Sequence, residues 1–231
     1  MGLPGATMDS FLGDLQQCID REVHARVHPT EVLMNSPMNE SGYRSENEIE
    51  IVRPLSQDWT EDRLTRKKAL IISTATFTRA DYEEMGRYRK LFLLSENYGV
   101  LRQISRFVRQ ETGTREIDFY GRIDADARTS PDRWPVMAFT FGAMTDFMIP
   151  PVSWQLFIDE VREYCIRELG IADSAPLDTV LRVQHALLPS RDRRYPCIVD
   201  LEHDFAGWHQ AMIEAKRGGE QSDWWGRVSH L

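Results

Sequence analysis

Residues 1–7 read MGLPGAT, and this stretch decides how the front of the chain is interpreted. Gly2 and Gly5 flank Leu3-Pro4, and a helical pattern of apolar residues follows directly. Glycines allow the sharp backbone turn with which a strand leads into a helix. Only Met1 precedes this turn, so we ask where the strand lies that feeds it.

The residues after the turn predict a helix and then a strand. Apolar residues recur at spacings of three and four over residues 8–23, which predicts an amphipathic helix with Thr7 as its N-cap. Residues 30–34, TEVLM, predict a short strand that ends at the turn-forming residues Asn35-Ser36-Pro37. A helix followed by a strand is the rhythm of a parallel α/β unit, in which glycine-rich turns commonly face a ligand.

The remainder of the chain is expected to be mostly helical. Residues 40–66 are polar and predict a loop or linker, and the β-branched residues within 67–77 favour a strand over the end of a helix. From Thr78 onward we expect a helix, because Thr78 and Asp81 resemble a capping box. Further helices are expected at 100–110, 115–126, 136–147, 153–169, 176–188 and 205–217, and one late strand at 197–205. We therefore divide the chain into residues 1–60, an α/β segment, and residues 61–231, a mostly helical module.

Composition limits the classes of partner. The chain has 231 residues, of which 42% are hydrophobic, so a buried core is expected. A net charge of -8 argues against a nucleic-acid partner. No apolar run approaches the about 20 residues that a membrane span requires, and residues 1–20 lack the basic start and apolar middle of a signal peptide. We expect a cytoplasmic protein without a membrane partner.

Two groups of residues carry candidate metal or acid–base chemistry. Asp200, Glu202 and Asp204 alternate along the late strand, with His203 among them, and alternate residues share one face. Such carboxylates can bind a cation or transfer protons, or they can be the solvated face of an edge strand. His24 and His28 have the four-residue spacing of helical metal ligands. Pro29 disfavours a helix there, so we interpret both histidines as surface or packing residues.

The three cysteines are Cys18, Cys165 and Cys197. Their odd number and wide separation argue against a disulfide framework and against a local cysteine-rich metal site. We expect three free and mostly buried thiols.

Several motifs in their order resemble the radical SAM superfamily. The GLPGAT turn with its amphipathic helix is similar to the family's GLPGET-type turn, and EVLMNSPMNESGY follows it. The phrase Leu33-Met34-Asn35-Ser36-Pro37-Met38, with Tyr43 after it, is similar to the subset that also carries a cobalamin-binding domain. LIISTATF, then TRADYEEMGRY, continue the pattern. Near the end, Gln184, Asp204-Phe205 and Trp208 match a glutamine-containing helix and an acidic-aromatic step, so the resemblance spans nearly the whole chain.

The resemblance implies a fold and a reaction. It implies an α/β fold in which a partial radical SAM (TIM-like) barrel segment is followed by a mostly helical C-terminal module. In the family, S-adenosylmethionine is cleaved at a 4Fe-4S cluster to a 5′-deoxyadenosyl radical. Cobalamin often supplies a methyl group to a small-molecule substrate, which makes many members methyltransferases. By the same resemblance, the adenosine side would be lined by eight residues: Gly2, Leu3, Pro4, Gly5, Val32, Leu33, Met34 and Asn35.

The chain also departs from the family pattern. It contains no CxxxCxxC loop to hold the cluster, and Ala6 stands where the family motif has Glu. We therefore expect an incomplete radical SAM enzyme, its C-terminal part, with no catalytic residue and no metal ligand of its own. The feeding strand and the cluster loop would lie in sequence ahead of Met1, either in a longer chain or on a separate chain.

Two alternatives to this interpretation stay open. The chain can be a non-catalytic partner subunit that docks on a cluster-bearing chain. It can also be a small metal-dependent hydrolase that uses Asp200, Glu202 and Asp204. Whether the chain is itself an enzyme is not decided by the sequence.

Overall fold

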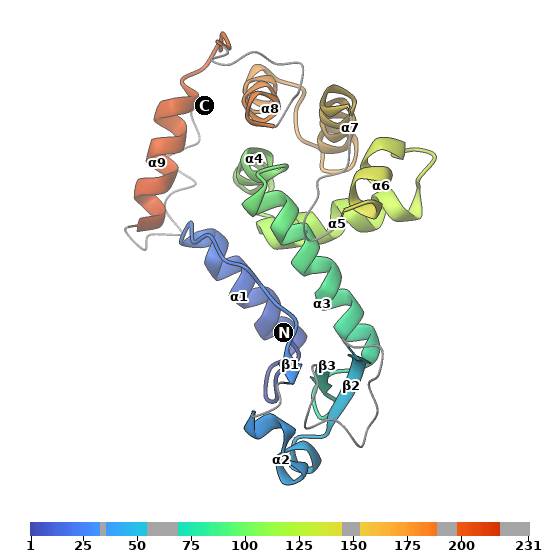
Figure 1. Cartoon of the computed structure of the whole chain (residues 1–231). Helices are drawn as coiled ribbons and strands as arrows, with labels where there is room; N and C mark the ends of the chain where they lie inside the picture. Colours follow the sequence, from blue (N-terminus) through green and yellow to red (C-terminus); the bar gives the residue numbers. More distant parts are fainter. Residues whose placement is uncertain (33–35, 55–68, 145–152, 189–197, 218–231) are drawn as a thin grey trace. The chain divides into compact units, whose positions relative to one another are not determined.

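The computed structural model describes residues 1–32, 36–54, 69–144, 153–188 and 198–217. The chain divides into two compact units (Figure 1). Unit 1 comprises Met1–Leu15 and Ala25–Arg89, and unit 2 comprises Gln16–His24 and Lys90–Leu231. Each unit is described by itself. The boundary that we expected near residue 60 stays a prediction.

The first helix, α1(Met8–Asp20), confirms the helix expected after the glycine turn. Thr7 caps it, because the Ser10 amide donates to Thr7 Oγ1 at 3.1 Å and the Phe11 amide donates to the Thr7 carbonyl at 3.0 Å. The helix ends earlier than the pattern predicts. Glu22 has a φ of 51°, a left-handed conformation that cannot continue an α-helix.

Unit 1 contains a small sheet of three strands, β1(Glu31–Val32), β2(Ile49–Pro54) and β3(Ala69–Ser73). Their order is β1-β3-β2, and β3 pairs antiparallel with both neighbours. β2 is irregular between Ile51 and Arg53, where its register shifts. Ile49 and Ile71 form the buried centre, on which Met38, Tyr43 and Ile51 pack. The strand predicted within 67–77 is confirmed.

The expected barrel segment is wrong. A barrel segment requires parallel strands joined by crossover helices, whereas the pairs of this sheet are antiparallel. After β3 the chain continues into helices, and among the described residues no further strand follows. The order of a helix followed by a strand does not distinguish the two arrangements, because such a strand can also pair antiparallel with a strand that comes later in the sequence, as β1 does with β3.

The loop predicted over 40–66 is also wrong in its described part. A short turn of 3-10 helix, η1(Pro37–Asn39), leads into α2(Ser41–Glu46) and then into β2. Ile49 and Ile51 alternate along β2, but their polar and charged neighbours obscured this strand pattern in the sequence. Pairing with β3 places both side chains in the apolar cluster of the sheet. Residues 55–66 of the predicted loop lie outside the described residues.

The capping box at Thr78 is confirmed at the start of α3(Arg79–Phe92). The Thr78 amide donates to Asp81 Oδ2 at 2.8 Å, and the Asp81 amide donates back to Thr78 Oγ1 at 3.1 Å. These bonds to the ionised carboxyl lower the pKa of Asp81, which is exposed. The helix continues into a π-helical turn, η3(Leu93–Asn97), which belongs to unit 2.

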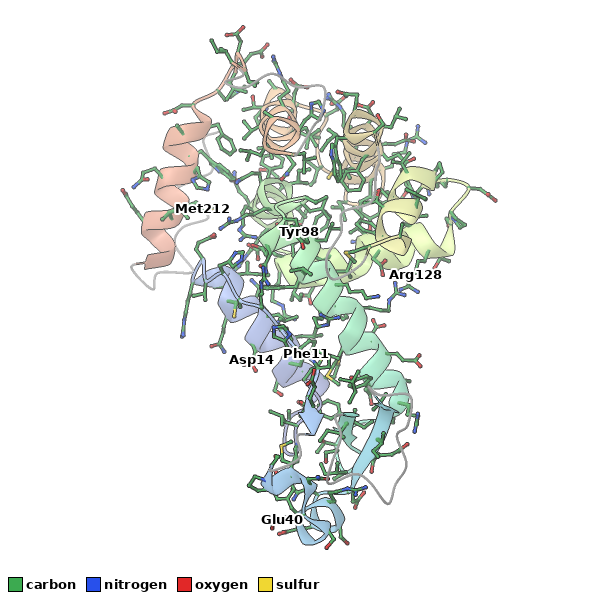
Figure 2. All side chains as sticks on the ribbon, viewed as in Figure 1. Phe11, Asp14, Glu40, Tyr98, Arg128 and Met212 are labelled. Carbon is green, nitrogen blue, oxygen red and sulfur yellow. The ribbon has the colours of Figure 1, made fainter. Side chains whose placement is uncertain are left out.

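Unit 2 is built of helices: α4(Arg102–Thr112), α5(Glu116–Thr129), α6(Pro135–Gly142), α7(Trp154–Arg167), α8(Ala175–Leu187) and α9(Phe205–Arg217). α4 packs against α5 and α8 (Figures 1 and 2). In turn, α5 packs against α6, α6 against α7, and α7 against α8. Side chains that are shielded from solvent fill its core, among them Phe107, Phe119, Phe157 and Val180.

The helices predicted for this part of the chain are confirmed, with ends shifted by a few residues. Ser153 caps α7 through its side chain, as predicted. Gly113 and Gly170 have φ values of 73° and 68°, and each follows the end of a helix. The helix predicted at 136–147 ends at Gly142, and residues 145–147 lie outside the described residues.

The late strand predicted at 197–205 is wrong. Residues 198–204 are described and form no strand, and Ile198 is 92% exposed. Within the described part of unit 2 no strand is present to pair with this segment. Asp204 instead caps α9, because the Gly207 amide donates to Asp204 Oδ1 at 2.9 Å.

Candidate functional site

The glycine turn lies in unit 1 beside the start of β1 and the end of β3. Gly2 and Gly5 both have positive φ, 79° and 78°, and the Ala6 amide closes the turn on the Leu3 carbonyl at 3.2 Å. The Ser73 amide at the end of β3 donates to the Gly2 carbonyl at 3.1 Å. The Thr30 hydroxyl donates to the Met1 carbonyl at 2.5 Å. Segments around residues 2, 30 and 73 therefore meet at one end of the sheet.

The other predicted site residues are placed only in part. Val32 is in β1, and Leu33, Met34 and Asn35 lie outside the described residues. Leu3 is exposed, and Pro4 is half-buried. The placed residues offer backbone carbonyls and amides rather than ionisable side chains. They can shape a wall, but they cannot transfer protons, and their assignment to the adenosine side stays a prediction.

Gly2 gives the first testable expectation. A Cβ at Gly2 would lie 3.3 Å from the Ile71 carbonyl oxygen and 3.3 Å from Ile72 Cγ2, whereas a Cβ at Gly5 would meet nothing within 4 Å. Both positions have positive φ, so Gly→Ala carries a conformational cost of about 1–2 kcal/mol at each. We expect both variants to have a lower free energy of unfolding than the wild type. The loss for Gly2→Ala should exceed the loss for Gly5→Ala by about 1 kcal/mol. Urea denaturation of the two variants measures this difference, and equal losses would contradict the close contact.

The acidic residues near the C-terminus do not form a shared face. Asp200, Glu202 and Asp204 are exposed on a segment that is not a strand, so the alternation argument no longer applies. Asp204 caps α9, and His203 lies with its Nδ1 3.4 Å from the Thr179 hydroxyl. Among the described residues, no group of three His, Cys, Asp or Glu side chains is arranged to hold a metal ion.

The other predicted metal and thiol candidates are also separated. His24 and His28 are exposed and lie beyond the end of α1. Cys18 is half-buried on α1, Cys165 is buried on α7, and Cys197 lies outside the described residues. Burial raises the pKa of the Cys165 thiol to about 12, so the thiolate that iron needs is disfavoured. The described cysteines therefore do not fit a 4Fe-4S cluster.

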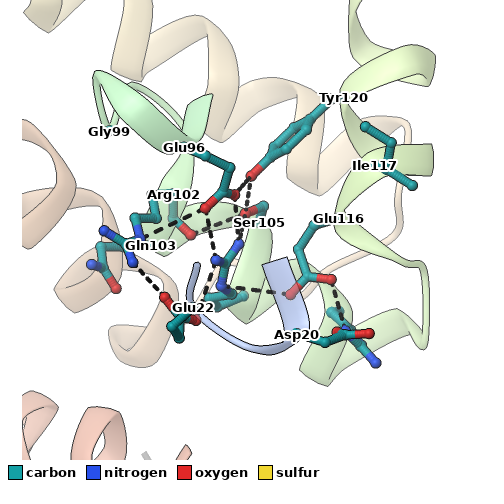
Figure 3. Close-up of polar contacts among 12 residues, drawn as sticks. Asp20, Glu22, Glu96, Gly99, Arg102, Gln103, Ser105, Glu116, Ile117 and Tyr120 are labelled. Carbon is teal, nitrogen blue, oxygen red and sulfur yellow. Dashed lines mark hydrogen bonds and ion pairs between the residues drawn. The ribbon is translucent and has the colours of Figure 1, made fainter. Parts of the chain in front are cut away.

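The most developed polar constellation is an ion-pair network inside unit 2 that sequence reasoning missed (Figure 3). Its centre is Arg106 on α4, which is 1% exposed. Arg106 forms a two-pronged contact with Glu96 of η3, with both N···O distances 2.8 Å. Its guanidinium also contacts Glu22 at 3.3 Å and Glu116 at 3.6 Å. Such a fork-to-carboxylate geometry is the strong form of a charged hydrogen bond.

A second arginine on the same face of α4 continues the network. Arg109 donates to Asp20 at 2.5 Å and to Glu116 at 2.8 Å. Gln16 donates to the same two carboxylates at 3.0 and 2.8 Å, and its carbonyl oxygen accepts the Ile117 amide at 3.2 Å. Glu116, which is 0% exposed, is thereby held by three different side chains.

The partners of Glu96 determine its ionisation. Burial acts to raise the pKa of Glu96, but Arg106, the hydroxyl of Tyr120 and Arg102 outweigh burial, so the pKa is lowered. Burial, followed by the charge of Glu96, raises the pKa of Tyr120 well above its usual range. The Tyr120 hydroxyl donates to Glu96 and lies 2.8 Å from the Ser105 hydroxyl (Figure 3). Glu96 is therefore a carboxylate, and Tyr120 is a neutral donor.

Acid should remove the contribution of Glu96. Because its folded pKa is depressed, its stabilisation is fully present above the unfolded pKa of about 4.3 and is lost as the pH falls through the lower folded value. We expect Glu96→Gln to lower the free energy of unfolding by about 2 kcal/mol at pH 7. The difference from the wild type should shrink below about pH 4.3, because the wild type then loses the charge that the variant already lacks. Urea unfolding at pH 7 and at acidic pH measures it, and a difference independent of pH would contradict this assignment.

The sequence contains a local pattern for one half of the network, the arginines of α4. Arg102, Arg106 and Arg109 follow one another at four and three residues, so the helical pattern places them on one face of α4. We counted only the apolar residues of that helix. The carboxylate partners lie up to 89 positions away, as in the pair of Asp20 and Arg109, and no local pattern identifies them.

Gln184, which the resemblance singled out, lies buried on α8 and connects it to the start of α4. Its side-chain amide donates to the Gly99 carbonyl at 2.5 Å, and its carbonyl oxygen accepts the Gln103 amide at 2.8 Å. The first amides of a helix lack intrahelical partners, and the residue before α4, Leu101, offers no side-chain cap. Gln184 thus acts as a cap supplied by another helix.

Comparison with known proteins adds no assignment. No known family model matches the chain. No curated protein matches it at the threshold of significance. No helix among the described ranges is long and apolar enough to cross a lipid bilayer.

Proposed function

We propose that this chain is the C-terminal part of a cobalamin-type radical SAM enzyme, in which sequence outside residues 1–231 holds the 4Fe-4S cluster. One observation carries the proposal. The glycine turn and the end of β3, two segments of the resemblance, are joined by the hydrogen bond from the Ser73 amide to the Gly2 carbonyl, and Thr30, directly before β1, bonds to both. The order of these segments along the chain and their proximity in unit 1 both support the proposal.

The chain's own chemistry suits a supporting role. Its described cysteines do not fit the cluster, so no radical-generating step is assigned to a residue of this chain. In the family the cluster and S-adenosylmethionine supply the 5′-deoxyadenosyl radical, and cobalamin commonly supplies a methyl group. Gly2, Leu3, Pro4, Gly5, Val32, Leu33, Met34 and Asn35 would line the adenosine side. The helices of unit 2 would shape the space for a small-molecule substrate.

The proposal is tested by purifying the chain without oxygen, tagged after Leu231 and expressed from its natural gene. Iron, sulfide and the sequences of all polypeptides in the sample are measured. We expect a 4Fe-4S cluster together with a CxxxCxxC sequence. If the CxxxCxxC sequence continues into residues 1–231, the chain is part of a longer enzyme. If it lies on a separate chain, the chain is a partner subunit.

A matched control uses the chain's own thiols. The triple variant Cys18→Ser, Cys165→Ala and Cys197→Ser should keep the iron content of the wild type, because the cluster ligands lie elsewhere. Loss of iron in this variant, with its fold retained by circular dichroism, would overturn the proposal. A sample without iron or a CxxxCxxC sequence would overturn it as well.

A further inference from the structure

Residues Gln16–His24, which we name the strap, belong to unit 2 although some 65 residues of unit 1 separate them from its other helices. The strap is attached to α4 and α5 mainly through polar side chains. Asp20 accepts from Arg109, and Glu22 accepts from Arg102 and Arg106. Gln16 bonds to Glu116 and to the Ile117 amide.

The apolar attachment of the strap is small. Ile19 is its one buried apolar residue, whereas Gln17, Arg21, Val23 and His24 are exposed. The helices that it contacts have continuous apolar cores, with Ile104, Phe107 and Val108 of α4 fully buried. Segments with few buried apolar contacts are the ones that open locally while the rest of a protein stays folded.

The charges that remain without the strap are still paired. Arg106 retains its fork to Glu96 and its contact with Glu116, and Arg109 retains Glu116 at 2.8 Å. Arg102 retains Glu96 at 3.7 Å. Opening therefore leaves no guanidinium of α4 without a carboxylate, which removes the largest cost of separating a buried ion network.

The closed strap also holds a strained residue. Glu22 has a φ of 51°, which a residue with a Cβ adopts only at a cost in free energy. This conformation accompanies the contacts of its carboxylate with Arg102 and Arg106. Opening releases the strain, so the ion pairs of the strap are opposed by its own backbone.

We propose that the strap is an ionic latch, which opens and closes as a unit while α4–α8 stay folded and which Asp20 and Glu22 hold closed. Closing screens Glu116 and Arg106 from solvent, and opening gives water access to the charged face of α4. This inference does not rest on the proposed function, because it concerns contacts within unit 2 alone.

Hydrogen–deuterium exchange of the full chain, followed by mass spectrometry, tests the latch. Asp20→Asn and Glu22→Gln keep the side-chain shape and remove the charge. Each should raise the opening equilibrium of peptides from residues 16–24 about tenfold. Peptides from α8(Ala175–Leu187) should be unchanged. Asp14→Asn is the matched control, because Asp14 is an exposed carboxylate on the same helix, and it should leave the strap unchanged.

A second measurement uses the wild-type chain and so does not depend on the folding of a variant. Raising KCl from about 0.1 to about 1 M shortens the Debye length from about 10 to about 3 Å. Exchange of the strap should then accelerate several-fold relative to α8. Equal acceleration of both, in either experiment, would show that the strap opens only by global unfolding. No change in the strap would show that Asp20 and Glu22 do not hold it. Either result overturns the latch.

Discussion

Arg106→Met is expected to lower the free energy of unfolding by about 3–5 kcal/mol, the largest loss among the changes considered. Methionine fills a similar volume but cannot donate hydrogen bonds. Glu96 would lose both prongs of its 2.8 Å contact, and Glu116 would lose its ion pair at 3.6 Å. Two carboxylates that are almost entirely buried would then have fewer partners, and burial of an incompletely paired charge is costly.

The matched control is Arg102→Met. Arg102 lies on the same face of α4 and contacts Glu22 and Glu96, but its side chain is 40% exposed. Solvent screens its charge, so Arg102→Met should lower the free energy of unfolding by at most about 1 kcal/mol. Urea denaturation at pH 7 measures both variants. Equal small losses would show that Arg106 is not the centre of the network.

Gln184→Leu is expected to lower the free energy of unfolding by about 3 kcal/mol. Leucine resembles glutamine in volume but leaves the Gly99 carbonyl and the Gln103 amide without the bonds that Gln184 provides. Both groups lie where α4 begins; the bond to the Gln103 amide is buried and the bond to the Gly99 carbonyl is partly buried. An unpaired buried backbone group costs about 1–3 kcal/mol. The start of α4 should fray, which amide exchange at residues 102–105 would report as lost protection.

The control for this change is Gln155→Leu on α7. Gln155 is exposed and bonds to Asp159 at 2.8 Å, one turn away on the same helix. Its replacement should alter the stability by less than about 0.5 kcal/mol. If the two variants lose the same stability, the cap between α8 and α4 does not contribute.

Helices of unit 2 were predictable because their signals are local. Apolar residues at spacings of three and four defined α4, α7 and α8, and the capping residue Ser153 marked the start of α7. In unit 1, Thr78 marked the start of α3 in the same way. Each signal lies within a few residues of the structure that it predicts. Caps and periodicity therefore transfer from sequence to structure without knowledge of the partners.

The direction of the sheet was not predictable in the same way. Strand pairing depends on residues far apart, as with Glu31 opposite Leu70. The sequence offers the same apolar strand to a parallel or an antiparallel neighbour. The strand predicted at 197–205 is wrong for a related reason, because strand propensity does not indicate whether another strand is available for pairing.

The buried polar groups required the structure as well. Charged residues on a helix normally indicate a solvated face, and nothing near Arg106 in the sequence indicates that it is buried. Its burial follows from carboxylates on η3, α5 and the strap, which only the fold brings together. Gln184 was noticed through the family resemblance, whereas its capping role emerges from its two backbone partners.

We propose above that the chain works within a radical SAM enzyme. The most direct test is to measure 5′-deoxyadenosine formed from S-adenosylmethionine and dithionite by the anaerobically purified material. We expect 5′-deoxyadenosine from material in which residues 1–231 accompany a cluster-bearing sequence, and none from residues 1–231 alone. Failure of the cluster-bearing material to form 5′-deoxyadenosine, or its formation by residues 1–231 alone, would overturn the proposed function.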